Sequence, residues 1–530
     1  MKEGYIMKNM MKKFVSLVLV CLMVFSVSTI AFATNGNRKN IEVTIKGETF
    51  DHYPQILVKG FGAGCVKFYY EDDPEQKSLF IPLDTDRLIS NLKNIDDYFV
   101  KSIKAKEPNV LYTILYSYIM DCLGMLALKP DGSNMDGVVA EAPGPVYVGN
   151  GKYEFFYDCR QSPATSAEYL KEAVVQVMNE TGSDKVELVG SSYGANIVTS
   201  YIYEYPEELS KVDTALLCAP SVGGMSFLGE LLSGNFNISP IGLCDFIYDL
   251  TDAGFIPDFF YLMEEAGILG IFLDALVEPV LRVAIYEAVA DVARDLLATL
   301  PTLWVCMPDE NFDDAMNFLY GENYKDPTHP YAGLIADVMH YHYDIANNSV
   351  EIYMDACEKN EDFKMAIISK YGNAAIPLTS GINIMDDGLV NLPVSSFGAT
   401  CTTYGASFPA DYKQQKYTDY NFMSPEWNID ASTGVFPFKT WYVSGLGHTQ
   451  KNEDYHKLLE DIIYKDIDVF SDIQWPQYLK VSDEDAERLV PVTTPEEKEK
   501  TLYDKLFSIF RKLLLISKTI FDNTFSKVFR

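Results

Sequence analysis

The sequence is short of positive charge. Its 530 residues include 43 Lys and Arg against 75 Asp and Glu, a formal net charge of -32. Proteins that bind nucleic acids present basic surface to the phosphates, so this balance argues against a nucleic-acid partner. Histidine is also scarce, with six residues in the whole chain. A search for a catalytic base among the histidines therefore has few candidates.

Closely spaced cysteines are lacking as well. None of the nine cysteines lies in a Cys-x-x-Cys pair, and their wide scatter matches no zinc-binding spacing. Eight of them follow residue 33. An even number permits disulfides in an exported chain but does not indicate which residues pair. The cysteines therefore predict no metal site, and their connectivity stays open.

A long uncharged stretch lies near the N-terminus. It runs from Phe14 to Ile30, follows a cluster of lysines, and precedes the tripeptide Ala-Phe-Ala at 31–33. This arrangement is typical of a secretory signal peptide. We therefore expect residues 1–33 to be removed and the mature protein to be secreted or held at the cell surface. An uncleaved membrane anchor is the alternative, because the stretch is near the lower limit of spanning length.

Strand-like and helix-like runs alternate along the middle of the chain, which shows no internal repeat. Helical patterns lie near 167–181 and from about 195, and strand patterns lie near 55–60, 153–157, 186–190, 213–220, 374–390 and 438–450. Such alternation predicts a mostly parallel sheet with helices on both faces. We expect one α/β domain over residues 34–480, interrupted by an apolar helical insertion at about 221–345.

The C-terminal part differs in composition. Residues 481–500 are acidic and contain proline, which is typical of a linker. In residues 501–530, Leu and Ile recur at intervals that place them on one face of a helix, and Lys and Arg outnumber Asp. A basic amphipathic helix is expected there. It would make peripheral contact with an anionic membrane or, alternatively, dock on the acidic surface of the protein itself.

The chemistry-bearing motif is Gly190-Ser191-Ser192-Tyr193-Gly194. It fits Gly-x-Ser-x-Gly and stands between a predicted strand and a predicted helix, the context in which such a serine acts as a nucleophile. Glycine stands two residues away on both sides of Ser192 alone, so Ser192 is favoured over Ser191. A small residue in a glycine-rich bend is the structural alternative.

The backbone N–H of Tyr193 is one predicted donor to an oxyanion formed at the serine. A second donor should come from the loop after an early strand, and "QILVKGFGAG" provides the N–H of Phe61, after Gly60. A dinucleotide-binding loop is the competing interpretation. It fails because Cys65 occupies the position of the third glycine in G-x-G-x-x-G.

The general base should be a histidine after a late strand, and His448 in "TWYVSGLGHTQ" is the one that fits. The orienting acid should lie between serine and histidine in the chain. Asp387 in "INIMDDGLV" is favoured, and Asp430 is the runner-up. His340 and His342 form an H-x-H pair, but no third or fourth ligand is evident, so we expect no metal there.

Six segments in order carry a family resemblance: "ILVKGFGAG", "YEFFYDCR", "KVELVGSSYGANIV", "LLCAPSVGG", "MDDGLV" and "SGLGH". Over residues 50 to 460, apart from most of the insertion, they resemble the lecithin:cholesterol acyltransferase family and its lysosomal phospholipase relatives. The resemblance implies an α/β-hydrolase fold with a large helical cap, Ser192, Asp387 and His448 as catalytic triad, and Phe61 and Tyr193 as oxyanion hole. It implies no metal and no organic cofactor.

These observations predict an exported serine ester hydrolase that acts through an acyl-serine intermediate. Because large apolar pockets bind apolar ligands, the apolar cap indicates a lipid substrate, and so a lipase, phospholipase or lipid acyltransferase. A secreted serine peptidase or a general carboxylesterase is the alternative within enzymes. A non-catalytic surface binding protein that keeps the hydrolase fold is the alternative from another class.

Overall fold

The computed structural model describes residues 43–45, 47–78, 116, 124–234, 239–251, 255–273, 291, 294–377 and 384–494. The predicted signal peptide at 1–33 and the predicted amphipathic helix at 501–530 lie outside these residues. Within the described ranges, no helix is both long and apolar enough to cross a membrane.

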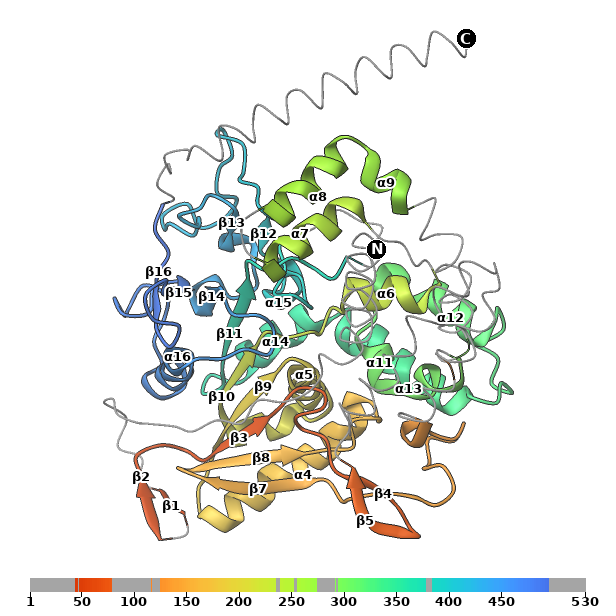
Figure 1. The fold of residues 1–530 in the computed structure, drawn as a ribbon. Helices are drawn as coiled ribbons and strands as arrows, with labels where there is room; N and C mark the ends of the chain where they lie inside the picture. The colour runs from red at the N-terminus through yellow and green to blue at the C-terminus, as the bar shows by residue number, and fades with distance from the viewer. Residues whose placement is uncertain are drawn as a thin grey trace.

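A mixed sheet forms the centre of the described chain. Its strands are Gln55–Val58 (β3), Gly144–Gly149 (β7), Lys152–Phe156 (β8), Val186–Ser191 (β9), Val212–Cys218 (β10), Lys364–Tyr371 (β11), Thr440–Ser444 (β14), Tyr478–Val481 (β15) and Leu489–Pro491 (β16). Their order is β16-β15-β14-β11-β10-β9-β3-β8-β7 (Figure 1). All neighbours from β15 to β8 pair in parallel, and the edge strands β16 and β7 pair antiparallel.

Helices pack on both faces of this sheet. The main ones are Pro163–Thr181 (α4), Tyr193–Glu204 (α5), Ser349–Lys359 (α14), Leu392–Ser395 (α15) and Glu453–Lys465 (α16). Because side chains alternate along a strand, β10 contributes to two cores. Ala215 and Leu217 pack with residues of α4 and α5, whereas Leu216 and Cys218 pack with residues of α16. The α/β class predicted from the sequence is confirmed.

The bounds of α4 follow from its local sequence. Ser162 precedes the helix, and its side chain accepts a hydrogen bond from the N–H of Thr165 at 3.2 Å. Pro163 occupies the first turn, where its missing N–H has no cost. Gly182 ends the helix with a φ of 66°, a left-handed conformation that glycine adopts readily. These signals place α4 directly between β8 and β9.

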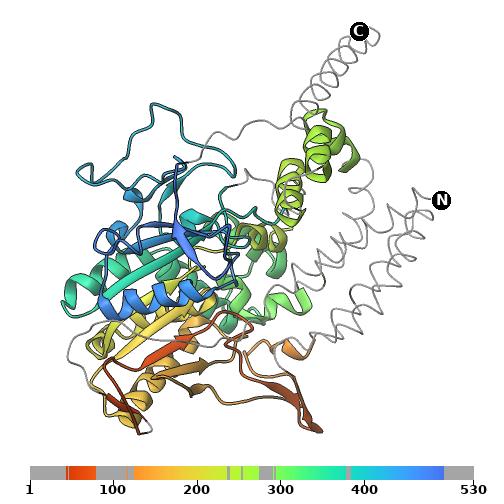
Figure 2. The same cartoon turned by 60° about the vertical axis from the view of Figure 1, so that its left-hand side comes forward.

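Between β10 and β11 the described residues form helices and connecting loops but no strand, in agreement with the helical insertion predicted at about 221–345. Besides α14, the described α-helices of this region are Ser226–Leu232 (α6), Pro240–Thr251 (α7), Phe255–Glu265 (α8), Ile268–Phe272 (α9), Pro301–Val305 (α11), Asp309–Tyr320 (α12) and Ala332–His340 (α13). Figures 1 and 2 show α7 to α9 standing apart from the sheet. α7 is tied to the segment after β11, since Asp249 accepts a hydrogen bond from the N–H of Ala374.

The described residues also form three smaller sheets. Their strands are Val43–Ile45 (β1) with Glu48–Phe50 (β2), Phe68–Tyr70 (β4) with Asp73–Ser78 (β5) and Val138–Ala140 (β6), and Thr400–Cys401 (β12) with Ile429–Asp430 (β13). β12 and β13 belong to the long excursion between β11 and β14.

Two predictions about strands are wrong. The strand expected at 374–390 is absent from its described part, which makes only isolated bridges, and the sheet strand is β11 just before it. Pro377 lacks the N–H that a central strand needs, whereas 365–369 runs without glycine or proline. The linker expected at 481–500 is wrong for its first half, because 489–491 forms β16. At this sheet edge Pro491 is tolerated; residues 495–500 lie outside the described ranges.

Candidate active site

Ser192 lies at the sharp turn between β9 and α5. Its φ of 52° and ψ of -125° place it in a sparsely populated backbone region, and such a conformation costs about 1–3 kcal/mol. The surrounding structure holds it there: the N–H of Ser192 donates to the carbonyl of Cys218 on the neighbouring strand at 2.9 Å. The side chain therefore projects from the end of the sheet rather than continuing the line of β9.

The glycines around Ser192 are required by close packing. A Cβ on Gly190 would lie 2.8 Å from the Cα of Ala195, and one on Gly194 would overlap the carbonyl oxygen of Val58. A Cβ on Gly60, in the loop after β3, would lie 2.9 Å from the Cβ of Ser192. Any larger residue at these three positions would push the turn apart. The close packing around the turn therefore requires the glycines of the motif.

The structure brings Ser192, His448 and Asp387 together. His448 Nε2 lies 2.7 Å from the Oγ of Ser192, and His448 Nδ1 lies 2.7 Å from Oδ2 of Asp387. With a carboxylate accepting at Nδ1, the neutral ring carries its proton there, and Nε2 is left to accept the hydroxyl proton of Ser192. The side chains of His448 and Asp387 are almost fully buried. This geometry is that of a nucleophile, a base and an orienting acid.

The carboxylate of Asp387 is itself fixed by its own turn. Oδ1 accepts hydrogen bonds from the N–H groups of Leu389 at 3.0 Å and Val390 at 2.8 Å. Its main-chain carbonyl accepts the N–H of His448 at 2.8 Å. One oxygen of the carboxylate is thereby held by the backbone, and the other is directed at the imidazole.

Neither the runner-up Asp430 nor Asp386, the neighbour of Asp387, makes a hydrogen bond to His448. Asp430 is buried, but its oxygens accept from Ser432 and from the N–H of Gln415 at 2.9 Å, all within its own excursion. Asp386 accepts the N–H of Gly388 at 2.6 Å. Burial and the neighbouring Asp387 charge raise the pKa of Asp386 well above its usual range.

The two predicted oxyanion donors flank Ser192. Tyr193 is the first residue of α5, so its N–H belongs to the group that finds no acceptor inside the helix. Phe61 follows Gly60, whose backbone passes directly over Ser192. The rings of Phe61 and Tyr193 meet edge to face with centroids 6.2 Å apart. Ser191, the alternative nucleophile, instead ends β9 and pairs with Cys218.

Lys370, near the end of β11, was not singled out by the sequence. Its buried Nζ donates to the carbonyls of Gly447 at 3.2 Å and His448 at 2.9 Å, and to that of Gln450. Burial, reinforced by the charge of Lys451, lowers the pKa of Lys370 to about 7. The only signal in the sequence is a lysine inside an otherwise apolar run.

The H-x-H pair does not converge on a shared site. His340 lies between Glu204 at 2.6 Å and Asp344 at 2.8 Å, whereas His342 lies 2.9 Å from Asp309. Throughout the described ranges, no group of three or more His, Cys, Asp or Glu side chains is arranged to hold a metal ion.

Cys65 and Cys159 form a disulfide, with Cα atoms 5.1 Å apart. Their separation of 94 residues explains why sequence reasoning left this pairing open. The other cysteines in the described ranges are free: Cys218, Cys244, Cys306, Cys357 and Cys401.

No protein-family model matches the chain, and a search of curated proteins found no significant match.

Proposed function

We propose that the chain is a serine ester hydrolase that acts through an acyl-serine intermediate. The observation that carries the proposal is the hydrogen-bonded series from Ser192 Oγ to His448 Nε2 and from His448 Nδ1 to Asp387 Oδ2, with 2.7 Å at each step. Serine alone is a weak nucleophile at neutral pH, and an adjacent base oriented by a third group is what activates it. A strained turn supports the same role, because such strain gathers at functional sites.

In the proposed reaction, His448 takes the proton of Ser192 as Oγ attacks the ester carbonyl. The resulting imidazolium is stabilised by the buried carboxylate of Asp387. The N–H groups of Phe61 and Tyr193 receive the charge on the carbonyl oxygen; one such donor is worth about 10² to 10³ in turnover. His448 then protonates the leaving alcohol, and water or a second alcohol releases the acyl group.

The topology supports an α/β-hydrolase fold with a helical cap. The three residues follow in the chain order serine, acid, histidine and come after β9, β11 and β14, which lie in the parallel part of one sheet. Ligands of open α/β sheets bind beyond the carboxyl ends of the strands, where these residues stand. The helices between β10 and β11 would be the cap.

An acyl chain is the proposed bound group, because the helical segment is rich in apolar residues over 240–273. Phospholipids, other lipid esters and lipid acceptors for acyl transfer are the substrates in view. The Cys65–Cys159 disulfide supports an exported location, since such bonds persist in oxidising compartments.

A fluorophosphonate probe tests the proposal. We expect covalent labelling of the wild type, loss of labelling in Ser192→Ala, and labelling at the wild-type level in the matched control Ser191→Ala. Labelling that survives in Ser192→Ala would overturn the assignment, and the absence of any labelling would favour a binding protein.

A chain-length series of p-nitrophenyl esters, run with phospholipid vesicles as a second substrate, tests the lipid part. Higher kcat/KM for long chains is expected. A higher kcat/KM for the acetyl ester would contradict the lipid substrate and favour a general carboxylesterase.

A further inference from the structure

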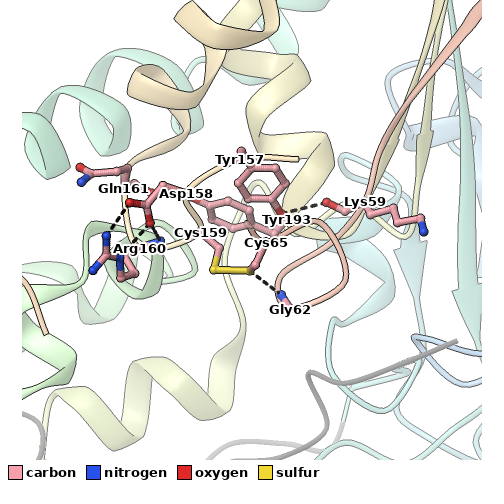
Figure 3. The surroundings of a disulfide bond; sticks show 9 residues. All are labelled: Lys59, Gly62, Cys65, Tyr157, Asp158, Cys159, Arg160, Gln161 and Tyr193. Atoms are coloured by element: carbon pink, nitrogen blue, oxygen red, sulfur yellow. Dashed lines mark hydrogen bonds and ion pairs between the residues drawn. A yellow bond between two sulfur atoms is a disulfide. The ribbon is translucent and has the colours of Figure 1, made fainter. Parts of the chain in front are cut away.

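The loop that carries Gly60 and Phe61 is covalently tied to a second segment. Cys65 ends this loop, and its disulfide partner Cys159 follows β8 (Figure 3). Cys65 also turns back on its own loop, since its Sγ accepts the N–H of Gly62 at 3.2 Å. The disulfide thus closes the loop at a point four residues after the predicted donor Phe61.

Tyr157, two residues before Cys159, makes hydrogen bonds to both ends of the same loop. Its N–H donates to the carbonyl of Gly64 at 2.9 Å, and its carbonyl accepts the N–H of Val66 at 2.9 Å. Its hydroxyl donates to the carbonyl of Lys59 at 2.9 Å, as Figure 3 shows. A Cβ on Gly64 would lie 2.5 Å from the Tyr157 ring. The loop therefore packs directly on this side chain.

The second predicted donor is held by the same segment. The ring of Tyr157 stacks on that of Tyr193, with centroids 5.9 Å apart. The hydroxyl of Tyr193 donates to the carbonyl of Gln161 at 2.9 Å. Residues 157–161 consequently contact both parts of the chain that would form the oxyanion hole.

The segment has a rigid anchor of its own. Arg160 is fully buried; its Nε donates to Oδ1 of Asp158 at 2.9 Å and its Nη2 to Oδ2 at 2.7 Å. The guanidinium also lies over the ring of Phe68, 4.4 Å from the centroid. A bidentate pair stacked on an aromatic ring restricts the backbone between Asp158 and Arg160, where Cys159 stands.

We propose that the Cys65–Cys159 disulfide and Tyr157 are positioning elements for the oxyanion loop, so that turnover depends on the disulfide being intact. The inference rests on the proposed serine hydrolase function. A small displacement of a preorganised hydrogen-bond donor lowers the reaction rate. A more mobile loop would therefore lose part of the roughly 10² to 10³ in rate that one oxyanion donor supplies. The loss should appear in kcat, since the donors act on charge that develops in the transition state.

Reduction of the wild-type protein is the first test. A dithiol such as dithiothreitol transfers two electrons to the S–S bond; it leaves as the cyclic disulfide, and Cys65 and Cys159 become thiols, which iodoacetamide then caps. We expect kcat for a p-nitrophenyl ester to fall 10- to 100-fold, with KM changed by less than threefold. The double variant Cys65→Ser with Cys159→Ser should match the reduced protein and should not respond to the dithiol. Wild-type kcat after complete reduction would overturn the inference.

Tyr157→Phe tests the positioning without touching the disulfide. It keeps the stacked ring and removes the hydroxyl that donates to Lys59, so we expect a three- to tenfold lower kcat at unchanged KM. Tyr153→Phe is the matched control on β8, because its hydroxyl lies 3.3 Å from Glu180 and not at the loop. Equal kcat in the two variants would contradict the role of Tyr157.

Amide hydrogen exchange separates this inference from the proposed function. Reduction should raise exchange in the peptide that covers residues 59–66, whether or not the protein turns over esters. Unchanged exchange would refute the positioning role. Turnover by the oxidised protein that persists in Ser192→Ala would instead refute the proposed function.

Discussion

Replacing Lys370 by methionine removes an ammonium group that donates to three carbonyls of the loop after β14, at residues 447, 448 and 450. Hydrogen bonds from a charged donor contribute about 1.5–3 kcal/mol each. Burial opposes them: it lowers the pKa of Lys370 from 10.5 to about 7, a shift worth about 5 kcal/mol. The two effects are similar in size. The free energy of unfolding should therefore fall by no more than about 2 kcal/mol, because Gly447 and His448 are half-buried as whole residues and Gln450 is exposed, so that water can replace the lost donor.

Activity should respond much more strongly than stability. A displacement of about 1 Å at a catalytic group can cost about 10² in rate, so we expect kcat to fall 10- to 100-fold while KM stays within threefold. Lys364→Met is the matched control, since Lys364 lies at the other end of β11, with its Nζ 3.2 Å from Asp466. Its kcat should stay within twofold of the wild type. Wild-type kcat in Lys370→Met would refute the reasoning.

The same burial predicts a pH dependence with a definite sign. A lysine whose pKa is lower in the folded state destabilises the fold while it is charged; this cost is complete below pH 7 and disappears as the pH rises from about 7 toward 10.5. Lys451 adds to the cost, and Asp387 and Cys218 reduce it. Wild-type stability relative to Lys370→Met should rise between pH 7 and 9.5, as denaturant unfolding measures. A flat difference would contradict the assignment.

Three further substitutions follow from the site and the core. Asp387→Asn should reduce kcat by at least 10³-fold, because the wrong imidazole tautomer of His448 is then favoured, whereas Asp430→Asn should retain turnover if it folds. A larger loss in Asp430→Asn than in Asp387→Asn would instead identify Asp430 as the orienting acid. Gly60→Ala should reduce kcat at least 100-fold, because its Cβ would lie 2.9 Å from that of Ser192, whereas the matched control Gly333→Ala has open space and should be neutral. Equal kcat in the two variants would refute the packing argument. Lys152→Met removes one partner of the buried ion pair with Glu460, 2.8 Å apart, and should lower the free energy of unfolding by about 3–5 kcal/mol. Urea unfolding measures this change, and a loss under 1 kcal/mol would contradict the prediction.

Local signals in the sequence were sufficient for the centre of the fold. Three consecutive features within 20 residues each have a local signal in the sequence. An apolar run marks β9, flanking glycines mark the turn at Ser192, and a helical pattern marks α5. The pairing of Asp387 and His448 was also predictable, because few histidines and a fixed chain order left few combinations.

Other features that depend on distant contacts were not predictable. The disulfide joins residues 94 positions apart, and no local pattern distinguishes Cys65 and Cys159 from the free cysteines. β11 was missed because Lys370 makes its apolar run look interrupted, and only the three carbonyls around Nζ explain why a lysine is tolerated there. β16 was missed because an edge strand needs little hydrophobic pattern and accepts Pro491.

The hydrogen bond between Ser192 and His448 spans 256 positions of the chain. Neither β9 with its turn nor β14 with its loop can make that contact alone; β10 and β11 must already lie between them in the sheet. Contacts of such long range form late, because closing the intervening chain is entropically costly. A nascent or partly refolded chain would therefore lack the assembled serine and base. Under the proposed function, regain of fluorophosphonate labelling would then report the last step of folding, and the chain would stay unreactive toward esters until that step is complete.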